Sequence, residues 1–89
     1  NYIDRAQVEV YLTPLVDNLL MGVIEEESAN ISVRDEDKQF IARIYGYVFI
    51  GIMLDWIKDG MNEDPVQIVD KLSILLKDSI ANALQKFQY

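Results

Sequence analysis

The chain has 89 residues, of which 51% are hydrophobic, and a net charge of −7 with eight basic residues scattered along it. This length makes a single domain, 1–89, and so high an apolar content in so short a chain favours association with another surface. Scattered basic residues argue against binding to nucleic acid, which needs a concentrated positive patch. Cysteine and histidine are absent, which excludes disulfides, zinc sites and Ser-His triads.

The start of the chain and its longest apolar run bear on where the protein acts. Residues 1–5 lack the basic region and apolar core of a signal peptide. The run from Ile44 to Leu54 is shorter than the roughly 18 apolar residues of a membrane span. We therefore expect a cytoplasmic protein that does not contact a membrane. The missing initiator methionine is typical of a piece of a longer protein.

Helical spacing of apolar residues runs through almost the whole chain and predicts an all-α fold of three to four helices. A first segment extends from about Tyr2 to Leu12, and a second begins at Thr13 and Pro14, which read as an N-cap followed by a first-turn proline. The apolar faces on the two sides of Pro14 are out of phase, so we expect a kink or break there. The face of the second segment is predicted to hold Leu15, Val16, Leu19, Leu20, Val23 and Ile24.

A central helix is predicted next, after a loop at Glu27–Ile31. Ser32–Asp35 resembles a capping box in which Asp replaces the usual Glu, and this marks the helix start. The helix should continue to Asp59, with Gly60 as its left-handed C-cap.

The last helix has the clearest start in the chain. Asp64 is suited to the N-cap and Pro65 to the first helical position. The short link Gly60–Glu63 makes the last two helices an antiparallel hairpin. The apolar face of the last helix comprises Ile68, Val69, Leu72, Leu75, Leu76, Ile80, Ala83, Leu84 and Phe87.

The central helix carries the main functional information, because it is apolar on every side over Ile44–Leu54. Such a helix cannot face water on any side, and one layer of neighbours in a small domain cannot cover it completely. Small residues around Gly46 would let another helix approach closely, either within the chain or from a second copy. The alternative is that Gly46 and Gly51 simply fit neighbours inside the chain.

The other side of the central helix is aromatic, with Tyr45, Phe49 and Trp56 at helical spacing. This side is either plain core or the wall of a ligand cavity, since such cavities are mainly apolar with a few polar groups. If it is a cavity, we place it against the segment after Pro14, which loosens the helix there. The predicted lining is Tyr11, Leu15, Leu19, Tyr45, Phe49, Met53 and Trp56.

Two acidic triplets, Glu25–Glu27 and Asp35–Asp37, invite a metal or catalytic interpretation. Consecutive carboxylates on a helix point in different directions and cannot converge on an ion. Ser73 and Ser79 have no base partner in a chain without histidine. We therefore expect no metal site, no cofactor and no catalytic residue.

The pattern of the last two helices resembles that of TetR-family transcriptional regulators. It runs aromatic-Gly-x-x-aromatic-apolar-Gly-apolar and Asp-Trp-Ile-Lys-x-Gly-Met within Tyr45–Met61, then Asp-Pro-x-x-Ile at Asp64–Ile68. The resemblance covers about Arg34–Phe87 and is weak over the first thirty residues.

The resemblance implies the C-terminal domain of a bacterial regulator. In that family an N-terminal helix-turn-helix domain binds operator DNA, whereas the C-terminal domain binds a small effector and dimerises through its last two helices. The chain would then be a fragment without the DNA-binding half, and the implied partners are a second copy and a small apolar effector. It would not bind nucleic acid itself. Together with the small-residue stripe, the implied dimer interface is Ala42, Gly46, Ile50, Ile57, Leu72, Leu76, Ser79 and Ala83.

The implied mechanism is a population shift. An effector that binds one arrangement of the helices better than another would alter the spacing of the two DNA-binding heads. The competing interpretation is a ligand-free helical scaffold or adaptor that mediates protein–protein association. An enzyme is not expected.

Overall fold

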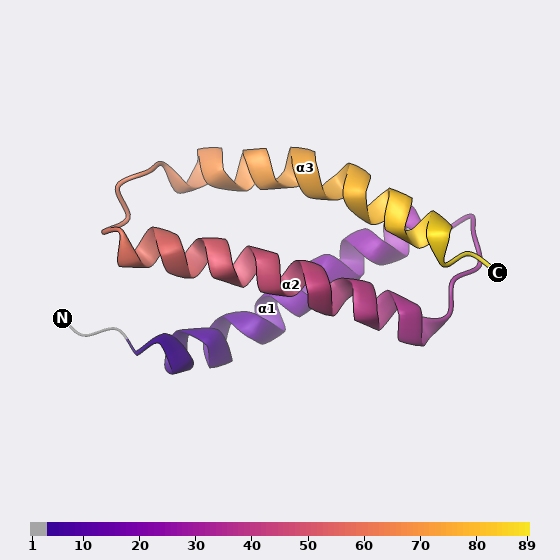
Figure 1. The fold of residues 1–89 in the computed structure, drawn as a ribbon, viewed down its shortest axis with the longest axis horizontal. Helices are drawn as coiled ribbons and strands as arrows, with labels where there is room; N and C mark the ends of the chain where they lie inside the picture. Colours follow the sequence, from indigo (N-terminus) through magenta and orange to yellow (C-terminus); the bar gives the residue numbers. More distant parts are fainter. Residues whose placement is uncertain (1–3) are drawn as a thin grey trace.

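The computed structural model describes residues 4–89, apart from the side chain of Arg5, and within this range the fold is all-helical, as predicted. The predicted helix start at Tyr2 lies outside the described residues. α2 and α3 lie side by side as an antiparallel hairpin, and α1 crosses α2 obliquely so that its end reaches the C-terminal part of α3 (Figure 1). The helices are α1 (Arg5–Glu27), α2 (Asp35–Lys58) and α3 (Pro65–Lys86).

α1 is one continuous helix, so the predicted break at Pro14 is wrong. Asp4 is the N-cap of this helix, and its side chain accepts a hydrogen bond from the Ala6 N–H at 3.0 Å. Thr13 does not cap a helix; its hydroxyl donates to the Glu9 carbonyl at 2.7 Å. A proline inside a helix removes one backbone hydrogen bond, but tertiary packing outweighs this loss. Residues spaced by four carry one packed stripe past the proline: Val8, Leu12, Val16, Leu20 and Ile24.

The buried face of α1 also differs from the predicted one. Val16, Leu20 and Ile24 are buried, whereas Leu15 and Leu19 are 53% and 58% exposed. The prediction placed all of them on one broad apolar face by their helical spacing, but the buried side of α1 is narrower. In the continuous helix, the four-residue stripe packs into the core, whereas Leu15 and Leu19 point away from it.

α2 begins later than predicted, because Ser32 is not its N-cap. Arg34 occupies that position and makes no side-chain capping bond. The residues before it are extended and held by the end of the chain: Val33 is buried and pairs with Gln88 in an isolated antiparallel bridge. The Tyr89 N–H donates to the Ser32 carbonyl at 3.0 Å, and the Arg34 guanidinium lies 4.8 Å from the centre of the Tyr89 ring. This contact with the chain end is non-local, so the capping-box pattern could not anticipate it.

The turn between α2 and α3 follows the prediction closely. Gly60 adopts a left-handed conformation with φ of 87°, and Met61 follows with φ of 59°. The Met61 N–H returns to the Trp56 carbonyl at 2.9 Å, which closes the end of α2. The Trp56 indole N–H donates to the Glu63 carbonyl at 2.8 Å, so the tryptophan ties the end of α2 to the start of α3.

The start of α3 is also as predicted. Asp64 is the N-cap, and its side chain accepts from the Val66 N–H at 2.9 Å, with Pro65 in the first turn. Such a cap satisfies one of the backbone donors that a helix start leaves free.

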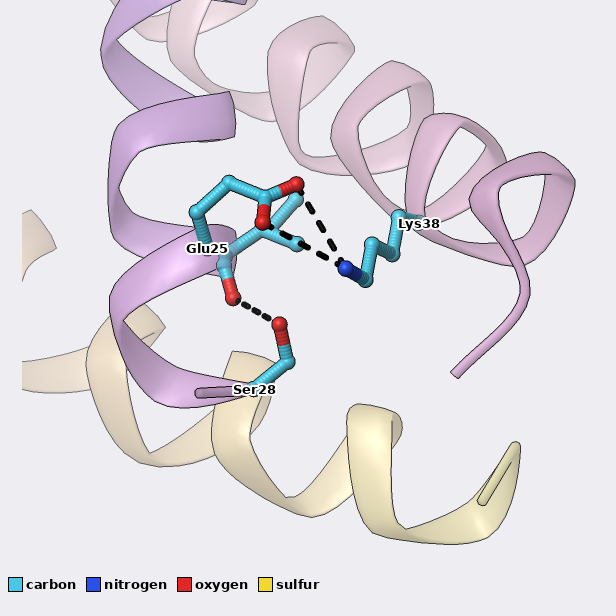
Figure 2. Close-up of polar contacts among 4 residues, drawn as sticks. Glu25, Ser28 and Lys38 are labelled. Carbon is cyan, nitrogen blue, oxygen red and sulfur yellow. Dashed lines mark hydrogen bonds and ion pairs between the residues drawn. The ribbon is translucent and has the colours of Figure 1, made fainter. Parts of the chain in front are cut away.

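The core is concentrated where the ends of α1 and α3 meet the start of α2. Its most deeply buried side chains are Ile24, Ile80 and Leu84. Ser28 is buried beside them, and its hydroxyl donates to the Ile24 carbonyl at 2.7 Å (Figure 2). The same carbonyl accepts from the Ser28 backbone N–H at 2.9 Å, so Ser28 closes the end of α1 with both its amide and its hydroxyl.

The three helices form a thin, elongated body of 49 × 24 × 16 Å. Its radius of gyration is 14.4 Å, against roughly 12 Å expected for a compact domain of this length. A body this thin cannot surround its central helix.

Replacing Trp56 with phenylalanine should lower the free energy of unfolding by about 1 kcal/mol, the typical net worth of one hydrogen bond. The substitution keeps an aromatic ring but removes the donor to the Glu63 carbonyl. Guanidinium unfolding followed by circular dichroism measures the change. An unchanged midpoint would show that the indole does not secure the hairpin.

Candidate functional site

α2 carries an apolar face that no part of the described chain covers. Helical spacing of three and four places its five large side chains on one side of the helix, over a length of roughly 18 Å. Each is between 38% and 66% exposed. Asp37 and Asp55 follow the same spacing at its two ends. We call this surface the α2 face; it consists of Phe40, Ile44, Tyr47, Val48 and Ile52.

On α3, an exposed leucine lies beside residues that pack inward. Leu75 is exposed and shares a stripe with Leu72, which is buried, and with Ile68, which is half-buried. Ser79 lies on the same stripe and donates its hydroxyl to the Leu75 carbonyl at 3.0 Å.

The predicted dimer interface is partly occupied within the subunit. Four of its members are buried inside the chain: Ala42, Gly46, Ile50 and Leu72. Ile57, Leu76 and Ala83 are half-buried. Ser79 is exposed. For the buried members of α2, contact with a second copy would require α1 to move, whereas the α2 face needs no such change. The assignment of this set to a dimer interface stays a prediction.

Gly46 shows how closely α1 approaches α2. A methyl group at this position would lie 3.5 Å from Oδ1 of Asp17 and 3.8 Å from Cδ1 of Leu20. Small residues on α2 therefore accommodate α1, which is the intramolecular alternative left open by the sequence. Gly51 differs, because a methyl group there would meet nothing within 4 Å.

An open groove of about 840 Å³ runs between α1 and α2. From α1 it receives a stripe of residues spaced by four, and from α2 both apolar and charged side chains. The lining is Glu9, Thr13, Asp17, Met21, Glu36, Gln39, Phe40, Ala42, Arg43, Gly46, Tyr47, Ile50, Gly51 and Leu54.

None of the seven residues predicted to line a ligand cavity lies on this groove. Tyr11, Leu15 and Leu19 are exposed on α1, whereas Tyr45 and Phe49 pack against the core cluster. Met53 and Trp56 are half-buried, and Trp56 bonds to the turn between α2 and α3. The structure does not bring the α1 and α2 members of this set together, and their role in binding a ligand stays a prediction.

The α1 wall of the groove follows a spacing in the sequence that could have predicted it. Glu9, Thr13, Asp17 and Met21 are spaced by four and form its α1 wall. Two of these residues precede Pro14 and two follow it, so the predicted break concealed their common face.

The acidic triplets lie near the loop between α1 and α2. Glu25 pairs with Lys38, with the Nζ 3.4 Å from Oε2, and this links the two helices (Figure 2). The Lys38 side chain is 14% exposed and that of Glu25 is 59% exposed, so solvent screens the pair and it contributes little to stability. Among residues 4–89, no three carboxylates gather in a way that would hold a metal ion.

The helix α2 is longer than its apolar run. The run Ile44–Leu54 is too short to span a membrane, but the whole helix Asp35–Lys58 is long and apolar enough to do so by length and composition. This is weak grounds for a span, because the core helix of a soluble protein passes the same test. Here α2 packs against both α1 and α3, as the central helix of a bundle does.

The fold and its uncovered face define an all-helical domain built around one apolar helix. A family model described as a transcriptional regulator C-terminal region matches residues 1–78. The chain therefore belongs to the TetR family, as a C-terminal region of a transcriptional regulator. This confirms the resemblance drawn from the hairpin motifs and extends it over α1. Comparison with curated proteins and with solved structures gave no match.

Gly46 offers a matched pair of substitutions at the α1–α2 contact. Gly46→Ala should be tolerated, since the added methyl makes ordinary contacts with Asp17 and Leu20. Gly46→Leu should lower the free energy of unfolding by about 1–3 kcal/mol, the usual cost of overpacking. Thermal unfolding of the two variants measures the difference. Equal stability would mean that α1 can shift away from α2 at no cost.

Proposed function

We propose that this chain is the dimerisation and effector-sensing region of a bacterial, cytoplasmic TetR-family regulator. The family assignment places it in a transcriptional regulator and points away from an enzyme. The observation that carries the proposal is the α2 face, where five large apolar side chains remain exposed on the central helix.

A second copy of the chain is the occupant that best fits the α2 face. Under two-fold symmetry the same surface is used by both subunits, so every exposed side chain of the face is buried on each copy. Val48 lies near the middle of this surface, and Asp37 and Asp55 lie at its ends. An apolar centre with polar ends is the usual arrangement of a protein–protein interface. Leu75 of α3 would extend the contact onto the hairpin.

The position of the groove beside the proposed interface supports a role in effector sensing. Phe40 and Tyr47 belong both to the groove and to the α2 face. A ligand in the groove would touch side chains that also contact the second copy. Binding energy at one surface would then bias the arrangement at the other, which is what a population shift requires. Through it the spacing of DNA-binding domains attached to the two subunits would change.

The alternative, a ligand-free scaffold, shares the dimer but gives the groove no role. The two interpretations differ in one observable. A regulator should dimerise with an affinity that changes when the groove is occupied, whereas a scaffold should dimerise with a fixed affinity.

The dimer is tested by placing a charge at the centre of the α2 face. Val48→Glu should convert a dimer at micromolar concentration into a monomer, because an unpaired charge buried in an interface costs roughly 3–5 kcal/mol. Val48 is 42% exposed, so the monomer should keep its helical circular dichroism. Sedimentation equilibrium measures the association.

Ile74→Glu provides the matched control. Ile74 is 72% exposed and lies two residues from the buried Leu72, and thus on the opposite side of α3. This variant should dimerise like the parent. A monomeric parent chain, or a Val48→Glu variant that dimerises normally, would contradict the proposed interface.

A further inference from the structure

We propose that the groove between α1 and α2 selects an organic cation with an apolar body. This inference rests on the proposed effector-sensing role and names the chemical class of the ligand. The groove volume of about 840 Å³ lies within the range of roughly 300–1,000 Å³ found for small-molecule sites. An apolar floor would take the body of the ligand, and it consists of Ala42, Gly46, Ile50 and Leu54.

The charge of the groove lining favours a cation. Besides Glu9, it holds the carboxylates of Asp17 and Glu36 and the single guanidinium of Arg43. The chain as a whole carries −7, so its field attracts cations and repels anions of the same size.

Asp17 is the central carboxylate. Its Oδ1 lies over Gly46, with 3.5 Å to the position that a methyl group would take. The absence of a side chain at Gly46 leaves the carboxylate directly above the apolar floor. Among the side chains that the structure describes, which leave out that of Arg5, no basic group lies within ion-pair distance of Asp17. A ligand cation would thus supply the counter-charge that the described chain does not.

Aromatic rings on the α2 side complete the site. The Arg43 guanidinium lies 5.3 Å from the centre of the Phe40 ring, so the groove already holds one cation against an aromatic face. Tyr47 lines the groove from the same helix and is well exposed. Cations are attracted to the faces of such rings. The Asp17 carboxylate on α1 and the Tyr47 ring on α2 line the same groove, and each would attract a cation bound there.

Tetraphenylphosphonium and tetraphenylborate are suitable probes because they share size and apolar surface but carry opposite charges. The 89-residue chain is titrated with each ion and followed by amide NMR shifts. The phosphonium ion should bind at least about tenfold more tightly than the borate ion, a difference of about 1.4 kcal/mol. Its shifts should centre on Gly46, Tyr47 and Gly51, and its affinity should fall as salt is raised.

Asp17→Asn tests the carboxylate without changing its shape. It should weaken phosphonium binding about fivefold or more, since the attraction of one partly exposed charge is lost. Asp70→Asn removes the same charge from the exposed surface of α3, away from the groove, and should leave binding unchanged. Equal affinity for the two ions, equal effects of the two variants, or shifts centred on Ile44 and Val48 would each overturn the inference.

The same samples separate this inference from the proposed function. Sedimentation of the parent with and without phosphonium reports dimerisation and its coupling to the groove. Charge-selective binding that depends on Asp17 in a monomeric chain supports the cation site while the dimer proposal fails. Binding of neutral triphenylphosphine oxide that shifts the dimer equilibrium, with no preference for the phosphonium ion, refutes the cation class and leaves effector sensing intact.

Discussion

A helix that is apolar around its whole circumference must be covered on every side, and a chain of this length supplies only two neighbours for it. α1 packs against the side of α2 that holds Ala42, Gly46 and Ile50, and α3 packs beside it in the hairpin. The remaining side is the α2 face. Neither α1 nor α3 can reach it without uncovering the core formed by Ile24, Ile80 and Leu84. The thin shape of the molecule and its exposed apolar surface are two consequences of the same shortage of cover.

The hairpin was predictable because its signals are local. Asp64 and Pro65 specify a helix start by capping and by a fixed φ, whatever lies around them. Gly60 specifies a helix end because its backbone tolerates positive φ. The same residues carried the resemblance to TetR-family regulators that the family match confirms. The all-helical class followed from periodicity, and the surplus of apolar surface on α2 followed from composition.

The features that sequence reasoning missed depend on contacts between distant residues. Ser32 has the residue type of an N-cap, but the pairing of Val33 with Gln88 holds this segment extended. Pro14 has the residue type of a helix start, but the stripe through Leu12 and Val16 keeps α1 continuous. The second error propagated, because the predicted cavity was built on a helix that begins at Pro14. Once α1 is continuous, its polar stripe faces α2 and its residues Leu15 and Leu19 face outward.

Phe40 and Tyr47 line the groove and also belong to the α2 face, which gives the proposed function a thermodynamic consequence. If a ligand in the groove favours positions of these side chains that strengthen the contact between copies, association must strengthen ligand binding by the same factor. The magnitude depends on how differently the two arrangements hold the ligand, and a ligand with equal affinity for both would change nothing. A groove formed entirely from α1 and the far side of α2 would lack this link. Under the proposed function, the groove would therefore gain its capacity to report from lying at the edge of an uncovered face, and the incomplete burial of α2 leaves both surfaces on one helix.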